Sequence, residues 1–511
     1  MEVLSSGFHL TSVISLVIYL CVFLLISCIV LFFLVVLHQG WKFRHIPGPK
    51  RSSVIYGCLQ EVREFLEKGN NKLDLLMKWQ AEYGTVFRYS ILHRYIIVAL
   101  DPDVVKEILG KPSVHWKPYV PYGIMGTLLG NRFMGNGLIT EANHARWKIH
   151  RAMLNPAFNR KYLMTMVETF NDHADHLVSY LTDRADGSQE VSMYDAFNNA
   201  TLDIIAKAGF GLELNVLDDP NNPFPNAILT CLNTIQSCIQ NPWMKYGLTS
   251  KVKKAKSEVK DACDLLRRVG KDCVENRLAA KARGEELPLD MLTNILEASK
   301  DLKGDENFGI EEMLDEFATF FIAGQETTSN VMSFTLEQLG KNPRVLQKVQ
   351  VELDEKIGGQ TFISFHDMGK LEYLNLVLKE ALRMYAPASI VNRVTGTDVK
   401  ASTGIVIPKG SQVSLSPFVM GRMAKYYKDP LIFRPERFIE SKHSPYAYFP
   451  FGYGQRSCIG QQFALIESRI IMAKLLQKLK FDLVPGQSWN ISFAVTIRPV
   501  DGCKNFVSLR H

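Results

Sequence analysis

One ten-residue stretch near the C-terminus constrains the fold more than any other part of the chain. Residues 451–460 read Phe-Gly-Tyr-Gly-Gln-Arg-Ser-Cys-Ile-Gly, and an apolar pattern with helical spacing follows from Phe463 onward. Glycine lets the backbone turn tightly, so Cys458 is expected in a loop just before a helix N-terminus. The positive charge of Arg456 and the helix N–H groups favour the thiolate, which is the form of cysteine that binds a metal.

The spacing within this stretch separates it from an ordinary structural thiol, which is the commoner role of a buried cysteine. Five residues match the haem-binding pattern Phe-x-x-Gly-x-Arg-x-Cys-x-Gly: Phe451, Gly454, Arg456, Cys458 and Gly460. On these residues the chain resembles the cytochrome P450 family, and further family motifs extend the resemblance over roughly residues 45–511.

The resemblance implies one large, mainly α-helical domain with a small β region. In that fold haem b lies between a long central helix and the helix that follows the cysteine loop. Cys458 is then the axial ligand of the haem iron, with Phe451, Arg456 and Gly460 around the cofactor. A thiolate ligand donates electron density to iron and favours O–O cleavage.

The N-terminal part contains a long apolar run from Thr11 to Leu37. As a helix it spans about 40 Å, enough to cross a hydrocarbon core of about 30 Å with some tilt. A cleaved signal peptide is the alternative, but the run is long for one, and no basic segment precedes it. We therefore expect one retained transmembrane helix within residues 1–40.

Positive charge follows the apolar run, at Lys42, Arg44, Lys50 and Arg51. This asymmetry predicts that the catalytic part faces the cytosol. Residues 41–52 contain the sequence His-Ile-Pro-Gly-Pro, which predicts a stiff hinge, and residues 53–511 form the expected haem-thiolate monooxygenase domain. The resemblance implies a single-pass protein of the endoplasmic reticulum membrane.

Composition limits the partners. A net charge of +7 suits an anionic membrane surface or an acidic protein partner but is too small to indicate nucleic-acid binding. The nine cysteines are scattered without zinc-type spacing, which predicts free thiols in a reducing compartment. No dinucleotide-binding pattern occurs, so the resemblance implies electron supply by NADPH–cytochrome P450 reductase.

Two basic motifs are candidate ligands of the haem carboxylates. Trp147 and Arg151 lie four residues apart and share one helical face. Both carry donors for a carboxylate, and the resemblance places them on a haem propionate. Arg393, on an expected strand, is a candidate ligand of the second propionate. A buried Trp beside an exposed Arg is the simpler alternative for the first pair.

A long helical pattern over residues 311–339 carries the motif Ala-Gly-Gln-Glu-Thr-Thr at 323–328. The resemblance places Ala323 and Gly324 against the haem, where glycine permits close backbone approach. Thr327 can then hydrogen-bond O₂ or a water, and Glu326 can supply protons. The alternative for Thr327 is a hydrogen bond back to its own helix, which Ser and Thr often make.

Glu380 and Arg383 lie three residues apart, so their charges meet on one helical face. The resemblance implies that this pair is buried and that Arg437 completes it. We expect these three residues to stabilise the backbone around the cysteine loop and to take no part in catalysis.

The substrate pocket is less clearly marked. The resemblance assigns the aromatic and glycine-containing segment 114–138 to the pocket roof, and it favours a bulky apolar substrate. Five residues are candidate pocket residues: Tyr119, Phe320, Ala388, Ile390 and Val495. Ordinary core packing is the alternative for each of them.

Several segments, among them 419–423, 448–451, 460–464 and 472–477, resemble the cholesterol 24-hydroxylase subfamily. They predict an O₂-dependent monooxygenase that hydroxylates a sterol side chain. One alternative is a fatty-acid or xenobiotic hydroxylase, although many fatty-acid enzymes carry Glu where this chain has Ala323. A reductase-independent haem-thiolate isomerase or synthase is another, and a non-enzymatic scaffold or haem sensor is a third. The Glu326–Thr327 pair favours the monooxygenase.

Overall fold

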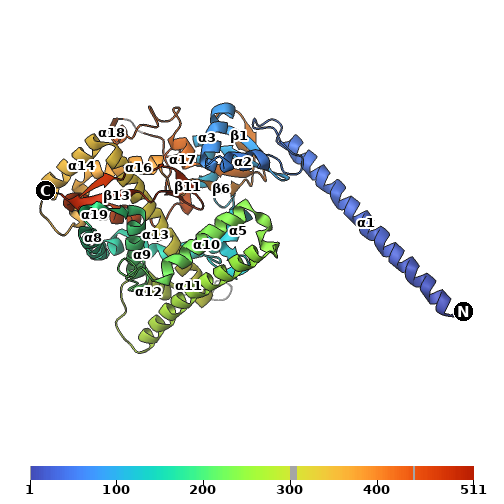
Figure 1. Ribbon diagram of the computed structural model, residues 1–511, viewed down its shortest axis with the longest axis horizontal. Helices are drawn as coiled ribbons and strands as arrows, with labels where there is room; N and C mark the ends of the chain where they lie inside the picture. Colours follow the sequence, from blue (N-terminus) through green and yellow to red (C-terminus); the bar gives the residue numbers. More distant parts are fainter. Residues whose placement is uncertain (1, 300–307, 441–442, 511) are drawn as a thin grey trace.

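The computed structural model describes residues 2–299, 308–440 and 443–510 of the 511-residue chain. Helices dominate it, as expected, and the strands are short (Figure 1). The α-helices are α1 (Glu2–Lys42), α2 (Leu59–Glu67), α3 (Lys72–Tyr83), α4 (Pro102–Gly110), α5 (Tyr119–Gly126), α6 (His144–Leu154), α7 (Arg160–Thr165), α8 (Val167–Thr182), α9 (Met193–Phe210), α10 (Pro223–Gln240), α11 (Ser250–Ala282), α12 (Met291–Ala298), α13 (Ile310–Lys341), α14 (Pro343–Lys356), α15 (Phe365–Lys370), α16 (Glu372–Met384), α17 (Pro417–Gly421), α18 (Arg437–Glu440) and α19 (Gln461–Lys478).

Helix α13 forms the centre of the fold. Acidic residues in its first turn and Lys341 in its last turn complement the helix dipole. The carboxylate of Glu312 also accepts the backbone N–H of Gly309, at 3.1 Å. From Met313 to Leu339 almost every residue is buried, so other elements cover the helix on all sides. The helix ends where Pro343 begins α14.

The larger sheet has the strand order β1 (Val86–Ile91), β2 (Arg94–Ala99), β9 (Gln412–Leu415), β6 (Val391–Val394). Strand β2 pairs antiparallel with β1 and parallel with β9, and Asn392 of β6 lies opposite Ser414. This sheet is the larger part of the expected small β region. The sheet places β6, with Arg393, inside the molecule.

The remaining strands form a three-stranded sheet and three hairpins. The sheet has the order β10 (Leu479–Leu483), β13 (Lys504–Leu509), β5 (Asp186–Ser192). The hairpins are β3–β4 (Thr127–Leu128, Asn131–Arg132), β7–β8 (Val399–Lys400, Val406–Ile407) and β11–β12 (Ile491–Phe493, Ile497–Pro499). The β11–β12 turn packs against α13 and borders the site described below.

Helix α1 projects away from the other elements (Figure 1). Its stretch Ile14–Lys42 contains an 18-residue window with a mean hydropathy of 3.4 that is 6% buried, so the helix is long and apolar enough to cross a membrane. It runs two residues past the expected boundary at residue 40. The following segment is held against β1, because Arg88 donates to the Ile46 carbonyl from Nε at 2.7 Å and to the Pro47 carbonyl from its backbone N–H at 2.8 Å.

Candidate functional site

The loop that carries Cys458 is folded by its own backbone. The Cys458 N–H donates to the Phe451 carbonyl at 2.8 Å, and α19 begins at Gln461. Gly454 has φ +74°, and a Cβ there would lie 2.4 Å from the Leu109 carbonyl oxygen. Only glycine fits that position. The expected glycine loop before a helix is therefore present.

The Cys458 thiol faces an internal space. Its side chain keeps accessible surface although it lies deep in the protein, and burial raises its pKa. The Gly460 backbone N–H and the charge of Arg151 oppose that rise. In the protein alone, loss of hydration thus outweighs the nearby positive charge. A bound metal ion deprotonates a coordinating thiol outright.

The cation beside the thiol is Arg151, whereas the sequence suggested Arg456. Arg151 donates to the Ser457 carbonyl at 2.8 Å and to Asn155 Oδ1 at 3.0 Å. Arg151 therefore hydrogen-bonds the cysteine loop, whereas the sequence predicted that it acts together with Trp147. Arg456 lies over the ring of Trp147 instead, 4.4 Å from its centroid.

On α13, one small face is open. Between Met313 and Leu339 the residues that retain accessible surface are Ala323, Gly324 and Thr327, which lie together at helical spacing. The Thr327 hydroxyl donates to the Ala323 carbonyl at 2.7 Å, which is the back-bonding alternative. Its oxygen still has lone pairs that can accept a hydrogen bond.

Side chains on either side of this open face join α13 to the cysteine loop and to α19. At one end the Phe320 ring stacks on Phe158 at 5.5 Å, and Phe158 contacts the Phe463 ring at 6.4 Å. At the other end Val331 belongs to a small apolar cluster against which Phe451 and Leu465 pack. These contacts bring α13 close to the cysteine loop and α19.

Two residues of α13 have neighbours that the sequence did not identify. A Cβ at Gly324 would lie 2.9 Å from Ile205 Cγ1, so the absence of a side chain there also favours close packing of α13 on α9. Phe320 is buried in the core against Phe158 and does not behave as an open pocket residue. Periodicity places both residues on a face of α13 but does not identify the neighbour.

The Glu326 side chain turns away from Thr327 toward the β11–β12 turn. Its Oε1 accepts the Thr496 hydroxyl at 2.6 Å, and its Oε2 has no hydrogen-bond partner among the described residues. Burial raises the pKa of Glu326, which Thr496 and Arg498 partly offset. Burial therefore shifts the carboxyl toward its neutral form.

Three cations meet near Trp147 in the interior: Lys117, Arg393 and Arg456. Burial and the other two cations hold the pKa of Lys117 well below its usual range. Burial, then Arg393, lowers the pKa of Arg456 to about 10. The buried Nε of Arg393 has no hydrogen-bond partner among the described residues.

Two carboxylates, Glu141 and Glu316, only partly offset the lowering of the Lys117 pKa, so the cluster keeps an excess of positive charge. Two carboxylates of a ligand would satisfy it, which is what the propionates of haem b carry. The residues present thus fit that group. Lys117 was missed in the sequence, although a lone lysine in an apolar, aromatic segment was an available signal.

The expected structural triad is assembled and fully buried. Arg383 donates to Glu380 from Nε at 2.7 Å and from Nη2 at 2.8 Å. Arg437 Nε donates to both carboxylate oxygens, at 2.9 and 3.1 Å. Both arginines also donate to backbone carbonyls between residues 421 and 432, which fixes the segment that leads to the cysteine loop.

The other candidate pocket residues keep accessible surface. Ala388 is exposed, and Ile390 and Val495 are half-buried. Their segments are joined, because the backbone N–H of Ile497 donates to the Pro387 carbonyl at 3.2 Å. Tyr119 is exposed at the start of α5, and its ring lies against Gly123. The role of these residues in substrate binding stays a prediction.

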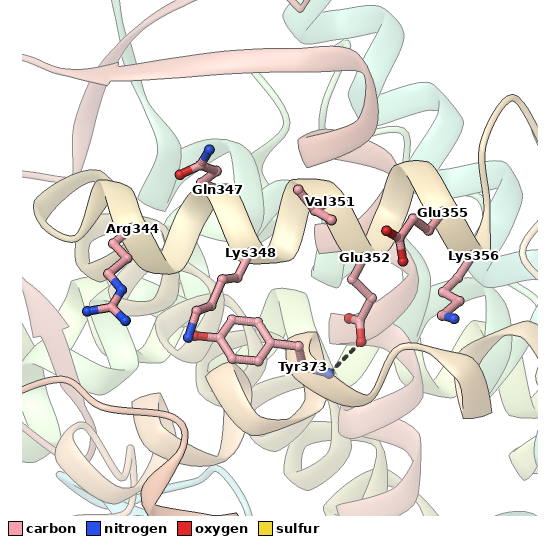
Figure 2. Close-up of a pocket in the computed structure, with 8 residues that line it drawn as sticks. All are labelled: Arg344, Gln347, Lys348, Val351, Glu352, Glu355, Lys356 and Tyr373. Atoms are coloured by element: carbon pink, nitrogen blue, oxygen red, sulfur yellow. Dashed lines mark hydrogen bonds between the residues drawn. The ribbon is translucent and has the colours of Figure 1, made fainter.

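A separate pocket of about 480 Å³ opens on the outer face of α14 (Figure 2). Its lining is mainly charged, and Glu352 accepts the backbone N–H of Tyr373 at 2.6 Å. None of its lining residues is an expected site residue. A surface groove of this kind does not suit an apolar substrate.

The mainly helical fold, the loop thiol, the open face of the central helix and the buried cations together suit a haem with a cysteine ligand. The chain belongs to the cytochrome P450 family, whose sequence model, described as Cytochrome P450, matches residues 47–499. It is 29% identical over 459 residues to cytochrome P450 3A11 of Mus musculus, which covers 87% of each chain. It is 28% identical over 452 residues to cytochrome P450 4d2 of Drosophila melanogaster, which covers 84% of this chain and 87% of the relative.

Membership of this family establishes the class of chemistry. The protein is a monooxygenase, an oxidoreductase that uses O₂, a redox-partner reductase and haem b with a cysteine thiolate ligand. The apolar helix α1 is consistent with a membrane anchor.

Proposed function

We propose that the enzyme hydroxylates the side chain of a sterol, most specifically cholesterol at carbon 24, and that α1 anchors it in the endoplasmic reticulum membrane with the catalytic domain in the cytosol. The observation that carries this proposal is the resemblance of segments around the cysteine loop and α19 to the cholesterol 24-hydroxylase subfamily. The apolar side chains of Ala388, Ile390 and Val495 support a rigid apolar substrate.

We assign Cys458 as the iron ligand. Arg393, Arg456, Lys117 and Trp147 would hold the haem carboxylates, because their donors converge near one interior region. When bound, the haem supplies O₂ activation, with electrons from NADPH–cytochrome P450 reductase.

The distal residues then have distinct tasks. Thr327, on the open face of α13, orients water or O₂ with its hydroxyl. Glu326 holds a proton for the reaction, because burial favours its neutral form. Glu380, Arg383 and Arg437 support the backbone of the cysteine loop without touching substrate.

The test is product identification from the full-length enzyme reconstituted with reductase in lipid vesicles and supplied with a sterol panel. NADPH-dependent side-chain hydroxylation of cholesterol is expected. Turnover of lauric acid with no sterol product refutes the sterol assignment in favour of a fatty-acid hydroxylase. Rearrangement of a lipid hydroperoxide without reductase, together with no NADPH-dependent product, favours the isomerase or synthase alternative. In Cys458→Ser, survival of the far-shifted Soret band of the reduced carbon-monoxide complex refutes the ligand assignment.

A further inference from the structure

The turn between β11 and β12 touches both the buried acid of α13 and the edge of the expected substrate pocket. Thr496 lies in this turn and is 7% exposed, and its hydroxyl donates to Glu326 Oε1 at 2.6 Å. Val495, the preceding residue, is half-buried at the pocket edge. The turn is compact, because the Ala494 N–H donates to the Thr496 carbonyl at 3.0 Å.

This contact fixes the orientation of the Glu326 carboxyl. Thr496 Oγ lies 2.6 Å from Oε1, so that oxygen is occupied by the hydrogen bond. Oε2 is left without a hydrogen-bond partner among the described residues. The Thr496 contact thus holds Glu326 so that one carboxyl oxygen is free for proton exchange.

Other groups fix the turn around Glu326. Asn330 of α13 donates from Nδ2 to the Thr496 hydroxyl at 3.5 Å. Arg498, on β12, favours the charged form of Glu326 and donates to Asn233 Oδ1 of α10 at 3.3 Å. Tyr194 of α9 also faces the carboxyl, since Glu326 raises the pKa of Tyr194. The acid is therefore surrounded by polar groups from α9, β12 and its own helix.

The same hairpin is attached to the substrate side. The Ile497 N–H donates to the Pro387 carbonyl at 3.2 Å, next to Ala388. Gln236 of α10 donates from Nε2 to the Phe493 carbonyl at 3.0 Å. A molecule that presses on Val495 or on Ala388 therefore acts on the backbone that carries Thr496.

We propose that Thr496 is a positioning residue that holds Glu326 for proton delivery, and that substrate contact with the hairpin turn adjusts this hydrogen bond. The proposal rests on the role of Glu326 given above. It links pocket occupancy to the arrival of protons at the reaction site. Thr496 itself does not contact the reacting atoms.

The consequence is measurable because protons decide how the electrons are used. Hydroxylation consumes a substrate C–H bond, O₂, two electrons and two protons and yields the alcohol and one water. Without productive proton delivery, O₂, two electrons and two protons leave as hydrogen peroxide. In both cases the electrons come from NADPH through the reductase. A misplaced acid should shift electrons from product to peroxide.

The experiment compares Thr496→Val, Thr496→Ser and Glu326→Gln in the full-length haem-loaded enzyme with reductase and NADPH. Thr335→Val is the matched control, because the Thr335 hydroxyl is buried on α13 and donates only to its own helix at Val331. The probe is cholesterol, or lauric acid if cholesterol gives no substrate-binding spectrum. Peroxide and hydroxylated product are both quantified against NADPH consumed.

We expect Thr496→Val and Glu326→Gln each to lower the product-to-peroxide ratio by about tenfold or more, with the substrate-binding spectrum unchanged. Thr496→Ser and Thr335→Val should keep the ratio. If the product-to-peroxide ratio is normal in Thr496→Val but low in Glu326→Gln, the role of Thr496 is overturned and the role of Glu326 stands. A normal ratio in Glu326→Gln overturns the role of Glu326 and this inference with it. Absence of a cholesterol spectrum tests only the sterol assignment.

A second measurement needs no turnover and no mutation at Thr496. The infrared carbonyl band of the neutral Glu326 carboxyl is identified by its loss in Glu326→Gln. The proposal expects this band to move when the probe binds, because the hydrogen bond from Thr496 changes. A band that is identical with and without the bound probe overturns the link between the pocket and the acid.

Discussion

Replacement of Gly324 by alanine tests whether this glycine serves helix packing or haem approach. An ideal Cβ at Gly324 lies 2.9 Å from Ile205 Cγ1 and 3.0 Å from Cδ1. Ile205 is 2% exposed on α9, so it has little room to move. Overpacking of this kind costs about 1–3 kcal/mol, whereas alanine in a helix gains about 1 kcal/mol over glycine. We therefore expect a net loss of about 0–2 kcal/mol of unfolding free energy.

The effect of Gly324→Ala on the unfolding free energy should change sign when Ile205 is also replaced. In an Ile205→Ala background the clash is gone, and the new methyl group fills part of the cavity. Gly324→Ala should then stabilise that background by about 1 kcal/mol through helix propensity alone. The two changes are thus coupled by about 1–3 kcal/mol, within the range found for residues in contact.

The assay is a double-mutant cycle on urea unfolding of the full-length haem-loaded protein in detergent. Gly369→Ala is the control, because a Cβ there meets nothing within 4 Å. It should be neutral or slightly stabilising. An equal loss from Gly324→Ala in both backgrounds, together with a weaker carbon-monoxide Soret band, would refute the packing explanation and restore haem approach as the reason for the glycine.

Three further changes test the buried charges. Glu380→Gln should cost about 3–5 kcal/mol of unfolding free energy, because two buried arginines lose their counter-charge. The control is Glu440→Gln, at an exposed ion pair, which should cost less than about 1 kcal/mol. Burial holds the pKa of Glu467 well above its usual range, so the stability that this residue contributes is complete at acidic pH and falls as pH rises toward that pKa. Glu467→Gln should therefore become more stable than wild type by up to about 1.4 kcal/mol per pH unit above pH 5. Urea unfolding as a function of pH measures this difference. Lys117→Met should raise the stability of the haem-free protein, because this cation is buried there among like charges. The same change should speed the transfer of haem to apomyoglobin, because the haem carboxylates lose one cation.

The features that sequence could predict are those set by local spacing. The glycines around Cys458 determine a loop whose hydrogen bonds lie within ten residues, and that loop formed as expected. Glu380 and Arg383 are three residues apart on α16, so their contact follows from helix geometry. The apolar length of α1 likewise needs no tertiary information.

The features that sequence could not predict depend on which distant element faces a side chain. Glu326 and Thr327 are neighbours in one motif, yet one meets a turn 170 residues away and the other bonds to its own helix. The neighbours of Arg151 and Arg456 depend on tertiary packing for the same reason. Both lie close to the cysteine loop, and the packing of α6 against it places Arg151 on the Ser457 carbonyl and Arg456 over the Trp147 ring.

Buried polar residues of α13 contact both the loop at residues 135–138 and the β11–β12 turn. Near its N-terminal end Asp315 accepts the Asn136 N–H at 2.9 Å, and Glu316 accepts the Leu138 N–H at 3.1 Å. A Cβ at Gly135 would lie 2.1 Å from Asp315 Oδ2, so this loop lies directly on the helix.

Two carboxylates therefore hold the loop over residues 136–138, and Asp315 is neutralised by Arg132 and Arg267, at 2.7 and 3.1 Å. Three turns further on, the same helix presents Glu326 to the β11–β12 turn. Because α13 is buried along this whole length, a displacement of the loop or of the hairpin acts on the helix that carries Thr327. Loss of any one of these carboxylates should thus affect the geometry of the open face, although none of the three lies on it.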